Sequence, residues 1–118
     1  MQIGYEVFHD DVNVLVDFYA RVLGFVATDH APGAGHIVVR RGSVVVGCTQ
    51  MPGATSTQRR PPHGSEIVLR VVDLDFEYRR VRDSGYPLAD ELQQRSWGLA
   101  DFRVFDPSGQ YIRVTTAT

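Results

Sequence analysis

The sequence predicts an α+β fold of two β-α-β-β-β modules, because one pattern of elements occurs twice. Asp73 lies 62 positions after Asp11, and Gly85 lies 61 positions after Gly24. In each repeat the Asp and the Gly bracket a segment with the apolar spacing of an amphipathic helix. An alternating segment with the period of a β-strand precedes each Asp. The chain ends in a predicted hairpin, residues 102–105 and 111–115, around an Asp-Pro-Ser-Gly turn.

The first module is expected within about residues 1–50. Residues 3–8 alternate as a strand, and Asp11 can cap a helix that ends at Gly24. Three further strands are predicted at 25–30, 36–40 and 43–49, separated by glycine-containing turns. The inward stripe of the helix is predicted to be Val12, Leu15, Val16, Tyr19, Val22 and Leu23.

The second module, at about 64–118, follows a connector, residues 51–63. The connector has neither the helical nor the strand period of apolar residues. A strand is predicted at 66–72 and a helix with the inward stripe Leu74, Tyr78 and Val81 after it, followed by three strand candidates. With 118 residues in total, we expect one domain, 1–118, of two modules.

Composition excludes several function classes. The net charge of −2 offers no electrostatic case for nucleic acid or an anionic membrane, and all twelve basic residues are arginine. Without lysine there is no amine nucleophile, whereas arginine favours ion pairs and contacts with rings. A single cysteine, Cys48, and an N-terminus unlike a signal peptide favour a cytoplasmic protein.

Three motifs carry a resemblance to a known family. They are "HDDV" followed by "FYARVLGF" after the first strand, "RVVDLD" before the second helix, and "WG" with "DPSG" before the last strand. In this order the chain resembles the vicinal-oxygen-chelate superfamily, which includes glyoxalase I, bleomycin resistance proteins and extradiol dioxygenases. The resemblance implies a sheet curled into a cup with the helices outside. It also implies a homodimer, formed in some members by exchange of an arm or module.

Strand alternation divides the predicted side chains between two faces. One face is expected to pack under the helices: Tyr5, Val7, Ile67, Leu69, Val71, Ile112 and Val114. The other is expected to face the cup: Gly4, Glu6, Phe8, Glu66, Val68, Arg70, Tyr111, Arg113 and Thr115.

Metal-dependent members of the family place ligands at four positions, which the resemblance carries onto Gly4, Val46, Glu66 and Arg113. Only Glu66 has a ligating atom, and a register slip would add only Glu6 or Cys48. We therefore expect neither a metal nor another cofactor. An ion pair between Glu66 and Arg113 would take the place of the cation, the alternative being that both side chains are solvated at the rim. Glu6 and Arg70 could form a second pair.

Trp97, in the "WG" motif, resembles the aromatic residue with which bleomycin resistance proteins stack on a planar drug. The alternative is a place in the core or in a dimer contact. Phe8 and Tyr111 would line the same cup, and Arg95 could add contacts to a ring or an anion. The four histidines are expected to be structural or exposed, and Cys48 to be a core residue.

The favoured function is metal-free binding of a planar aromatic or peptidic antibiotic or natural product, with resistance by sequestration. Its site would include Trp97, Phe8, Tyr111, Arg113, Glu66, Glu6 and Arg70, and no catalytic residue. One rival is an enzyme of the same fold, either metal-dependent or using Glu66 as a base and Arg113 to stabilise an oxyanion. Another is an interaction module with an occluded cup. Neither nucleic acid nor a membrane is an expected partner.

Overall fold

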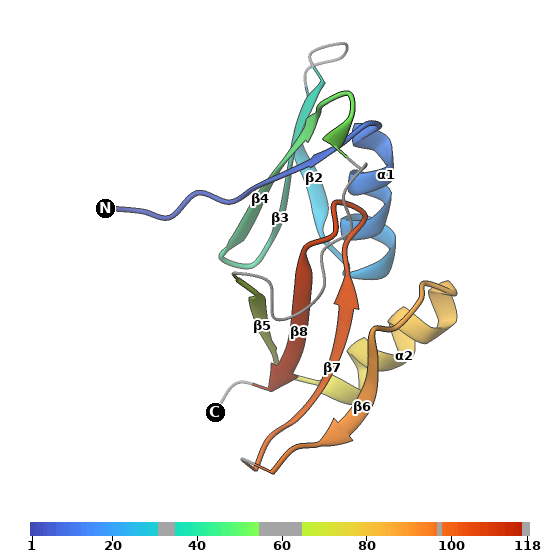
Figure 1. Cartoon of the computed structure of the whole chain (residues 1–118). Helices are drawn as coiled ribbons and strands as arrows, with labels where there is room; N and C mark the ends of the chain where they lie inside the picture. Colours follow the sequence, from blue (N-terminus) through green and yellow to red (C-terminus); the bar gives the residue numbers. More distant parts are fainter. Residues whose placement is uncertain (31–34, 55–64, 97, 117–118) are drawn as a thin grey trace. The chain divides into compact units, whose positions relative to one another are not determined.

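The computed structural model describes residues 1–30, 35–54, 65–96 and 98–116. The chain divides into two compact units, Met1–Gln58 and Arg59–Thr118, and each contains a four-stranded mixed sheet (Figure 1). The predicted α+β class with two modules is confirmed, each module having a sheet of its own. Within the described ranges, no helix has the length and apolarity needed to cross a membrane.

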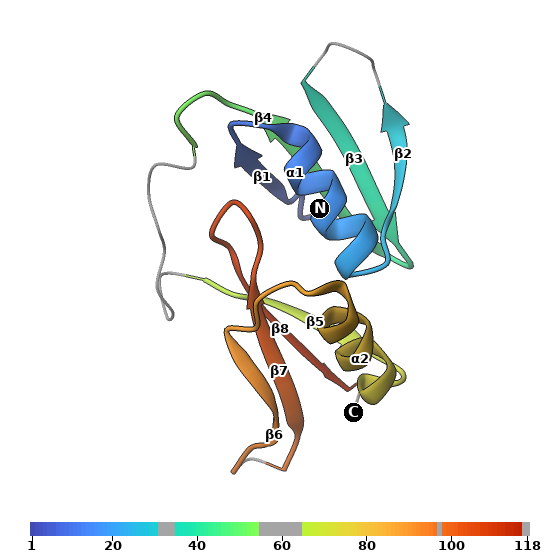
Figure 2. The same cartoon turned by 90° about the vertical axis from the view of Figure 1, so that its right-hand side faces the viewer.

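The first unit pairs its strands in the order β1-β4-β3-β2, with β1 parallel to β4 and the other neighbours antiparallel. Figure 2 shows α1 in front of this sheet, and α1 contacts β1, β4 and β3. The elements are β1 (Glu6–His9), α1 (Val12–Asp17), a π-helical turn η1 (Phe18–Val22), β2 (Val26–His30), β3 (His36–Arg41) and β4 (Val44–Gln50).

The first helix departs from the single regular helix that the sequence predicts. Asp11 caps it as expected, accepting a hydrogen bond from the Asn13 amide at 3.0 Å. From Phe18 the helix widens into a π-helical turn, which turns both Phe18 and Tyr19 into the core at 1% exposure. Their rings pack edge to face, with centroids 5.0 Å apart. The predicted Val16 is only half-buried, whereas Phe18, which the predicted stripe omits, is buried.

The second unit repeats the topology, in the order β5-β8-β7-β6 with β5 parallel to β8. Asp73 caps its helix through the Phe76 amide, and the helix ends at Gly85, whose φ of 77° is strained for a residue with a side chain. The elements are β5 (Ile67–Val71), α2 (Leu74–Ser84), β6 (Asp90–Gln94), β7 (Ala100–Phe105) and β8 (Tyr111–Thr116).

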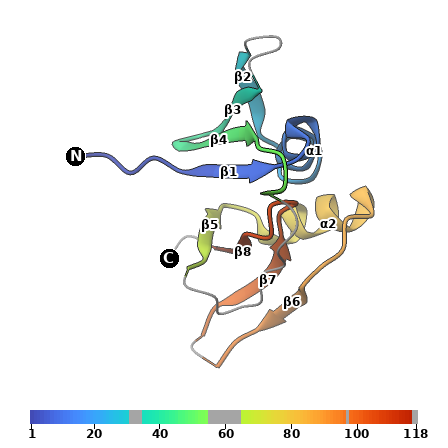
Figure 3. The ribbon, with the colours of Figure 1, turned by 45° about the horizontal axis from the view of Figure 1, so that its top comes forward.

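One face of each sheet forms a core with the helix of its unit. Figure 3 shows α1 on one side of β1 and β4, and Val7, Val46 and Cys48 are buried in this sheet. In the second sheet, the buried residues Phe102, Val104, Ile112 and Val114 are at most 2% exposed. The predicted inward residues on edge strand β5, which are Ile67, Leu69 and Val71, are half-buried.

The inward stripe of α2 is only partly as predicted. Leu74 and Val81 are buried, whereas Tyr78 is half-buried and lies against Phe102 with ring centroids 5.3 Å apart. Glu77, which the sequence pattern places on the polar side, is 6% exposed and lies 4.0 Å from the Arg80 guanidinium. The buried face of α2 is therefore wider than the stripe that the spacing of apolar residues predicts.

The turn between β7 and β8 is organised by the buried carboxylate of Asp106, which is 2% exposed. Its Oδ1 accepts the backbone amides of Ser108 at 2.8 Å and Gln110 at 2.9 Å. Tyr86 donates its hydroxyl to the Phe105 carbonyl beside this turn. Burial, with the nearby Asp106 charge, raises the pKa of Tyr86 to about 12. The turn predicted from Asp-Pro-Ser-Gly is thus held by side-chain hydrogen bonds as well as by backbone preference.

Replacing Asp106 with alanine should destabilise the protein by about 2 to 3 kcal/mol, because the buried Gln110 amide loses its acceptor. Urea unfolding followed by circular dichroism measures this. Asp83→Ala, at an exposed position late in α2, is the control and should change stability by less than about 0.5 kcal/mol. Equal effects of the two substitutions would show that the turn network contributes nothing.

Candidate functional site

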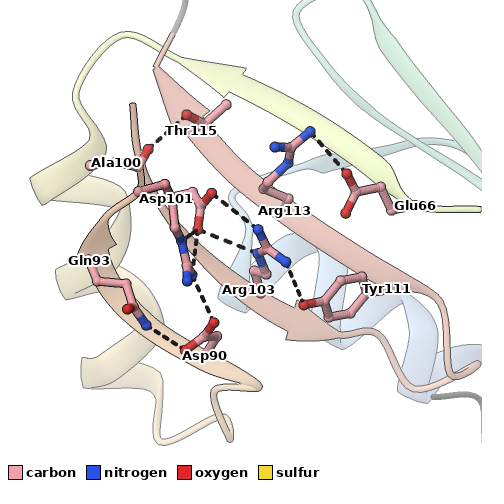
Figure 4. A network of polar contacts seen from close by, with 10 residues as sticks. Glu66, Asp90, Gln93, Ala100, Asp101, Arg103, Tyr111, Arg113 and Thr115 are labelled. Atoms are coloured by element: carbon pink, nitrogen blue, oxygen red, sulfur yellow. Dashed lines mark hydrogen bonds and ion pairs between the residues drawn. The ribbon is translucent and has the colours of Figure 1, made fainter. Parts of the chain in front are cut away.

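The face of the second sheet opposite its apolar core carries a network of charged side chains. The β7–β8 register sets Arg103 directly opposite Arg113, and Asp101 opposite Thr115. Figure 4 shows these side chains on the same side of the two strands. We call the following set the arginine face: Glu66, Arg70, Asp90, Arg95, Asp101, Arg103, Tyr111 and Arg113.

Asp101 is the buried centre of this network, at 1% exposure. Its carboxylate accepts a hydrogen bond from Arg95 Nε at 2.8 Å, and Arg95 Nη2 lies 2.7 Å away. Arg95 also binds Asp90 at 2.8 Å. Desolvation lowers the pKa of Arg95, but the hydrogen bonds with Asp101 and Asp90 outweigh it, so that the pKa is raised. Arg95 therefore stays charged, and it lies nearer to the Asp101 carboxylate than Arg103 does.

Arg103 is held more loosely by the same carboxylate. Its Nε and Nη2 lie 3.4 and 3.5 Å from the two Asp101 oxygens, and its Nη1 donates to the Tyr111 hydroxyl at 3.1 Å. The guanidinium also lies 5.7 Å from the centre of the Tyr111 ring. Desolvation lowers the pKa of Arg103, and hydrogen bonds to Tyr111 and Asp101 raise it by more. Tyr111, which in turn packs against Phe105, thus positions this arginine.

The predicted ion pair between Glu66 and Arg113 is present. Arg113 Nη2 lies 2.9 Å from Glu66 Oε1, and the two side chains are 24% and 32% exposed. Glu66 immediately precedes β5, which runs parallel to β8, and this places it beside Arg113 (Figure 4). The pair is half-buried, so it is neither a dry core ion pair nor a fully solvated one.

Two donors in this network form no hydrogen bond within the part of the chain that the structure describes, although the first of them lies 3.4 Å from an Asp101 oxygen. They are Arg103 Nε and Arg113 Nε, and both atoms are buried. A buried donor without a partner costs about 1 to 3 kcal/mol, so native proteins seldom keep one. Here two occur on arginines that are direct neighbours across the strands.

The first sheet presents a different set of polar residues on its own open face. Glu6 lies over Gly47, where a Cβ would overlap its carboxylate, and it contacts His36 Nε2 at 3.3 Å and Thr49 Oγ1 at 3.2 Å. Phe8, predicted to line a site, is 38% exposed. His36, predicted only as structural or exposed, is thus a partner of Glu6. The suggested pair of Glu6 with the exposed Arg70 would join the two units and stays a prediction.

The registers correct one of the four positions carried over from metal-dependent relatives. Glu6 pairs with Gly47 in the first unit, and Val68, 62 positions after Glu6, pairs with Arg113 in the second. The counterpart of Arg113 is therefore Gly47, and the assignment to Val46 is wrong because Val46 faces the core at 3% exposure. In the second unit, Glu66 and Arg113 do not fit a divalent cation, since the one carboxylate already pairs with a guanidinium. In the first unit, Gly4 and Gly47 have no side-chain donor.

Sequence reasoning missed Asp90, Asp101 and Arg103. A signal existed, because Asp101 and Arg103 alternate with the apolar Phe102 and Val104, which predicts that they share the face of Arg113. Trp97, placed first among the predicted ligand contacts, lies outside the described residues.

Comparisons with known proteins agree with this architecture. The family model described as "Glyoxalase/Bleomycin resistance protein/Dioxygenase superfamily" matches residues 4–114. No curated protein is significantly similar in sequence.

Several solved structures are similar over nearly their whole length. TioX from Micromonospora sp. ML1 is 22% identical with a TM-score of 0.79, covering 100% of this chain and 99% of its own. A bleomycin resistance determinant encoded on the transposon Tn5 is 22% identical with a TM-score of 0.73, over 98% and 97% of the chains. Lactoylglutathione lyase from Agrobacterium tumefaciens is 17% identical with a TM-score of 0.72, over 99% and 93%. At these identities the likeness concerns the fold.

Asp101→Asn should destabilise the protein by about 3 kcal/mol, because it leaves two partly buried arginines without their shared carboxylate. Asp17→Asn is the matched control. It breaks an exposed pair with Arg21, whose side chains are 57% and 52% exposed, and should cost less than about 0.5 kcal/mol. Thermal and urea unfolding of both variants measures the difference. A loss for Asp101→Asn no larger than that of the control would contradict a structural role for the network.

Proposed function

Because the chain belongs to the glyoxalase/bleomycin resistance protein/dioxygenase superfamily, we propose that it binds a planar aromatic or peptidic natural product without a metal. Protection would then come from sequestration, so that the amount of protein and its affinity decide how much of the compound stays free. The superfamily hosts unrelated activities, so this proposal rests on the residues of the site.

The observation that carries the proposal is the ion pair between Glu66 and Arg113. At the positions where metal-dependent relatives hold a cation, this chain has a guanidinium already bound to a carboxylate at 2.9 Å, and two glycines. A cation there would meet the fixed positive charge of Arg113. The chemistry of these residues suits binding of a ligand better than Lewis-acid catalysis.

Aromatic side chains supply the expected contact with a planar ring. Tyr111 lies on the arginine face, held by Arg103 at its hydroxyl and by Phe105 at its ring. Phe8 is an exposed aromatic residue of the first sheet. Trp97 stays a proposed stacking residue on the strength of the sequence. A ring held in place offers contact area with few rotatable bonds to freeze on binding.

A homodimer is part of the proposal, with exchange of an arm or module as one way to form it. Each sheet has two edge strands, and pairing or covering them by a second copy would protect their free backbone groups. Sedimentation velocity at micromolar concentration should give twice the mass of 13.2 kDa. A monomer mass at that concentration would contradict this part of the proposal.

Trp97→Ala should weaken binding by about 1 to 3 kcal/mol, a tenfold to hundredfold loss, if its indole stacks on the ligand. The test is titration of bleomycin and planar aromatic antibiotics, read by the fluorescence of this single tryptophan and by calorimetry. Trp97→Phe should recover part of the affinity. Phe76→Ala, an exposed aromatic residue on α2, is the matched control and should bind as the unsubstituted protein does.

Two results would count against the proposal. Trp97 would be structural if Trp97→Ala unfolds and if, in the unsubstituted protein, no compound that binds changes the tryptophan emission. Conversion of a bound compound to product without a metal would favour the enzymatic alternative with Glu66 as base, and binding that a chelator abolishes would favour the metal-dependent alternative. Product analysis and titration with and without chelator separate these outcomes.

A further inference from the structure

We propose that the arginine face binds an acidic group of the ligand, a carboxylate, sulfonate or phosphate, between the cross-strand neighbours Arg103 and Arg113. This inference rests on the proposed function and narrows it from planar compounds in general to those that carry an anion.

The first argument is the placement of like charges. Arg103 and Arg113 occupy directly opposite positions on antiparallel strands, an arrangement that is destabilising unless other charges compensate it. Arg113 is compensated by Glu66 at 2.9 Å, whereas the compensation of Arg103 is incomplete. Asp101 is engaged by Arg95 at 2.7 Å and meets Arg103 only at 3.4 and 3.5 Å. A ligand anion would complete the neutralisation.

The second argument is the unused hydrogen-bonding capacity. Arg113 contacts Glu66 through Nη2, and its buried Nε has no acceptor within the described residues. The buried Nε of Arg103 lies 3.4 Å from an Asp101 oxygen but forms no hydrogen bond with it. A guanidinium presents Nε–H and an adjacent N–H as a planar fork that matches two oxygens of a carboxylate or phosphate. In Arg103 the Nε and Nη2 of this fork already face Asp101 at 3.4 and 3.5 Å, and both Nε atoms are buried, so that a ligand anion would use the terminal N–H groups of the two arginines.

The third argument concerns access and charge. The side chains of Arg103 and Arg113 are 19% and 24% exposed, so that each is partly accessible although its Nε atom is buried. Arg70 is exposed on the same side of β5, opposite Thr115, and adds a fourth arginine to Arg95, Arg103 and Arg113. These four face three carboxylates in the network: Glu66, Asp90 and Asp101. The arginine face, as defined, therefore carries one positive charge in excess.

The experiment uses three probes on the full chain: 2-naphthoate, its neutral analogue 2-naphthamide, and sodium sulfate. Affinities are measured by calorimetry. The arginine Nε–Hε resonances of ¹⁵N-labelled protein are followed by NMR, with assignments from single arginine variants. We expect 2-naphthoate to bind at least about tenfold more tightly than 2-naphthamide, and the Arg103 and Arg113 resonances to shift with the acid only.

Arg113→Gln and Arg103→Gln should each reduce the preference for the acid, measured as the ratio of the two affinities in the same variant, to about twofold or less. Arg21→Gln, at an exposed arginine of the first unit, is the control and should keep the full preference. Circular dichroism of each variant checks that it is folded, and the resonance shifts of the unsubstituted protein test the inference without any variant.

The outcomes separate the two proposals. Equal binding of acid and amide with unmoved arginine resonances overturns the anion site and supports the binding of planar compounds. Shifts with sulfate, while neither naphthalene compound binds more tightly than sulfate, support the anion site and overturn the aromatic ligand. No binding and no shift with any probe overturns both.

Discussion

The carboxylate of Asp101 is the constraint on which the second unit depends. At 1% exposure it is a buried charge, and such a charge persists only if cations and hydrogen bonds compensate it. Arg95 does so from the chain before β7, and Arg103 does so from β7 itself. This requirement draws β6, β7 and β8 into one polar network on the side of the sheet that α2 does not cover, and it orients Tyr111 through Arg103.

The two units share a topology but differ in what they place on their open faces. In the first, the absence of a side chain at Gly47 makes room for Glu6, which lies between His36 and Thr49. In the second, the equivalent strand position is Arg113, which holds Glu66. Equivalent strand positions of the two units thus carry residues of different chemistry, because strand register decides where a side chain lies but not which residue type occupies the position.

These differences bear on function more than the fold does. Structures as different in name as a bleomycin resistance determinant and a lactoylglutathione lyase are similar to this chain over more than nine-tenths of their length. In its second unit this chain has the Arg113 guanidinium paired with Glu66, and Arg103 directly opposite Arg113 across the strands. Binding of an anionic planar compound is consistent with both features.

The sequence by itself determined the two modules, their Asp caps, the final hairpin and the pair of Glu66 with Arg113. The modules, the caps and the hairpin follow from local periodicity or from the repeat, whereas the pair of Glu66 with Arg113 follows from the family resemblance together with β-strand alternation, which places side chains on a face. Only the tertiary structure decided the π-helical turn that buries Phe18 and the burial of Glu77. It also decided the register of β1 on β4, which pairs Glu6 with Gly47 and not with Val46. The partners of Asp101 also emerged only there. They come from different strands, and their distances depend on packing between segments that no local pattern encodes.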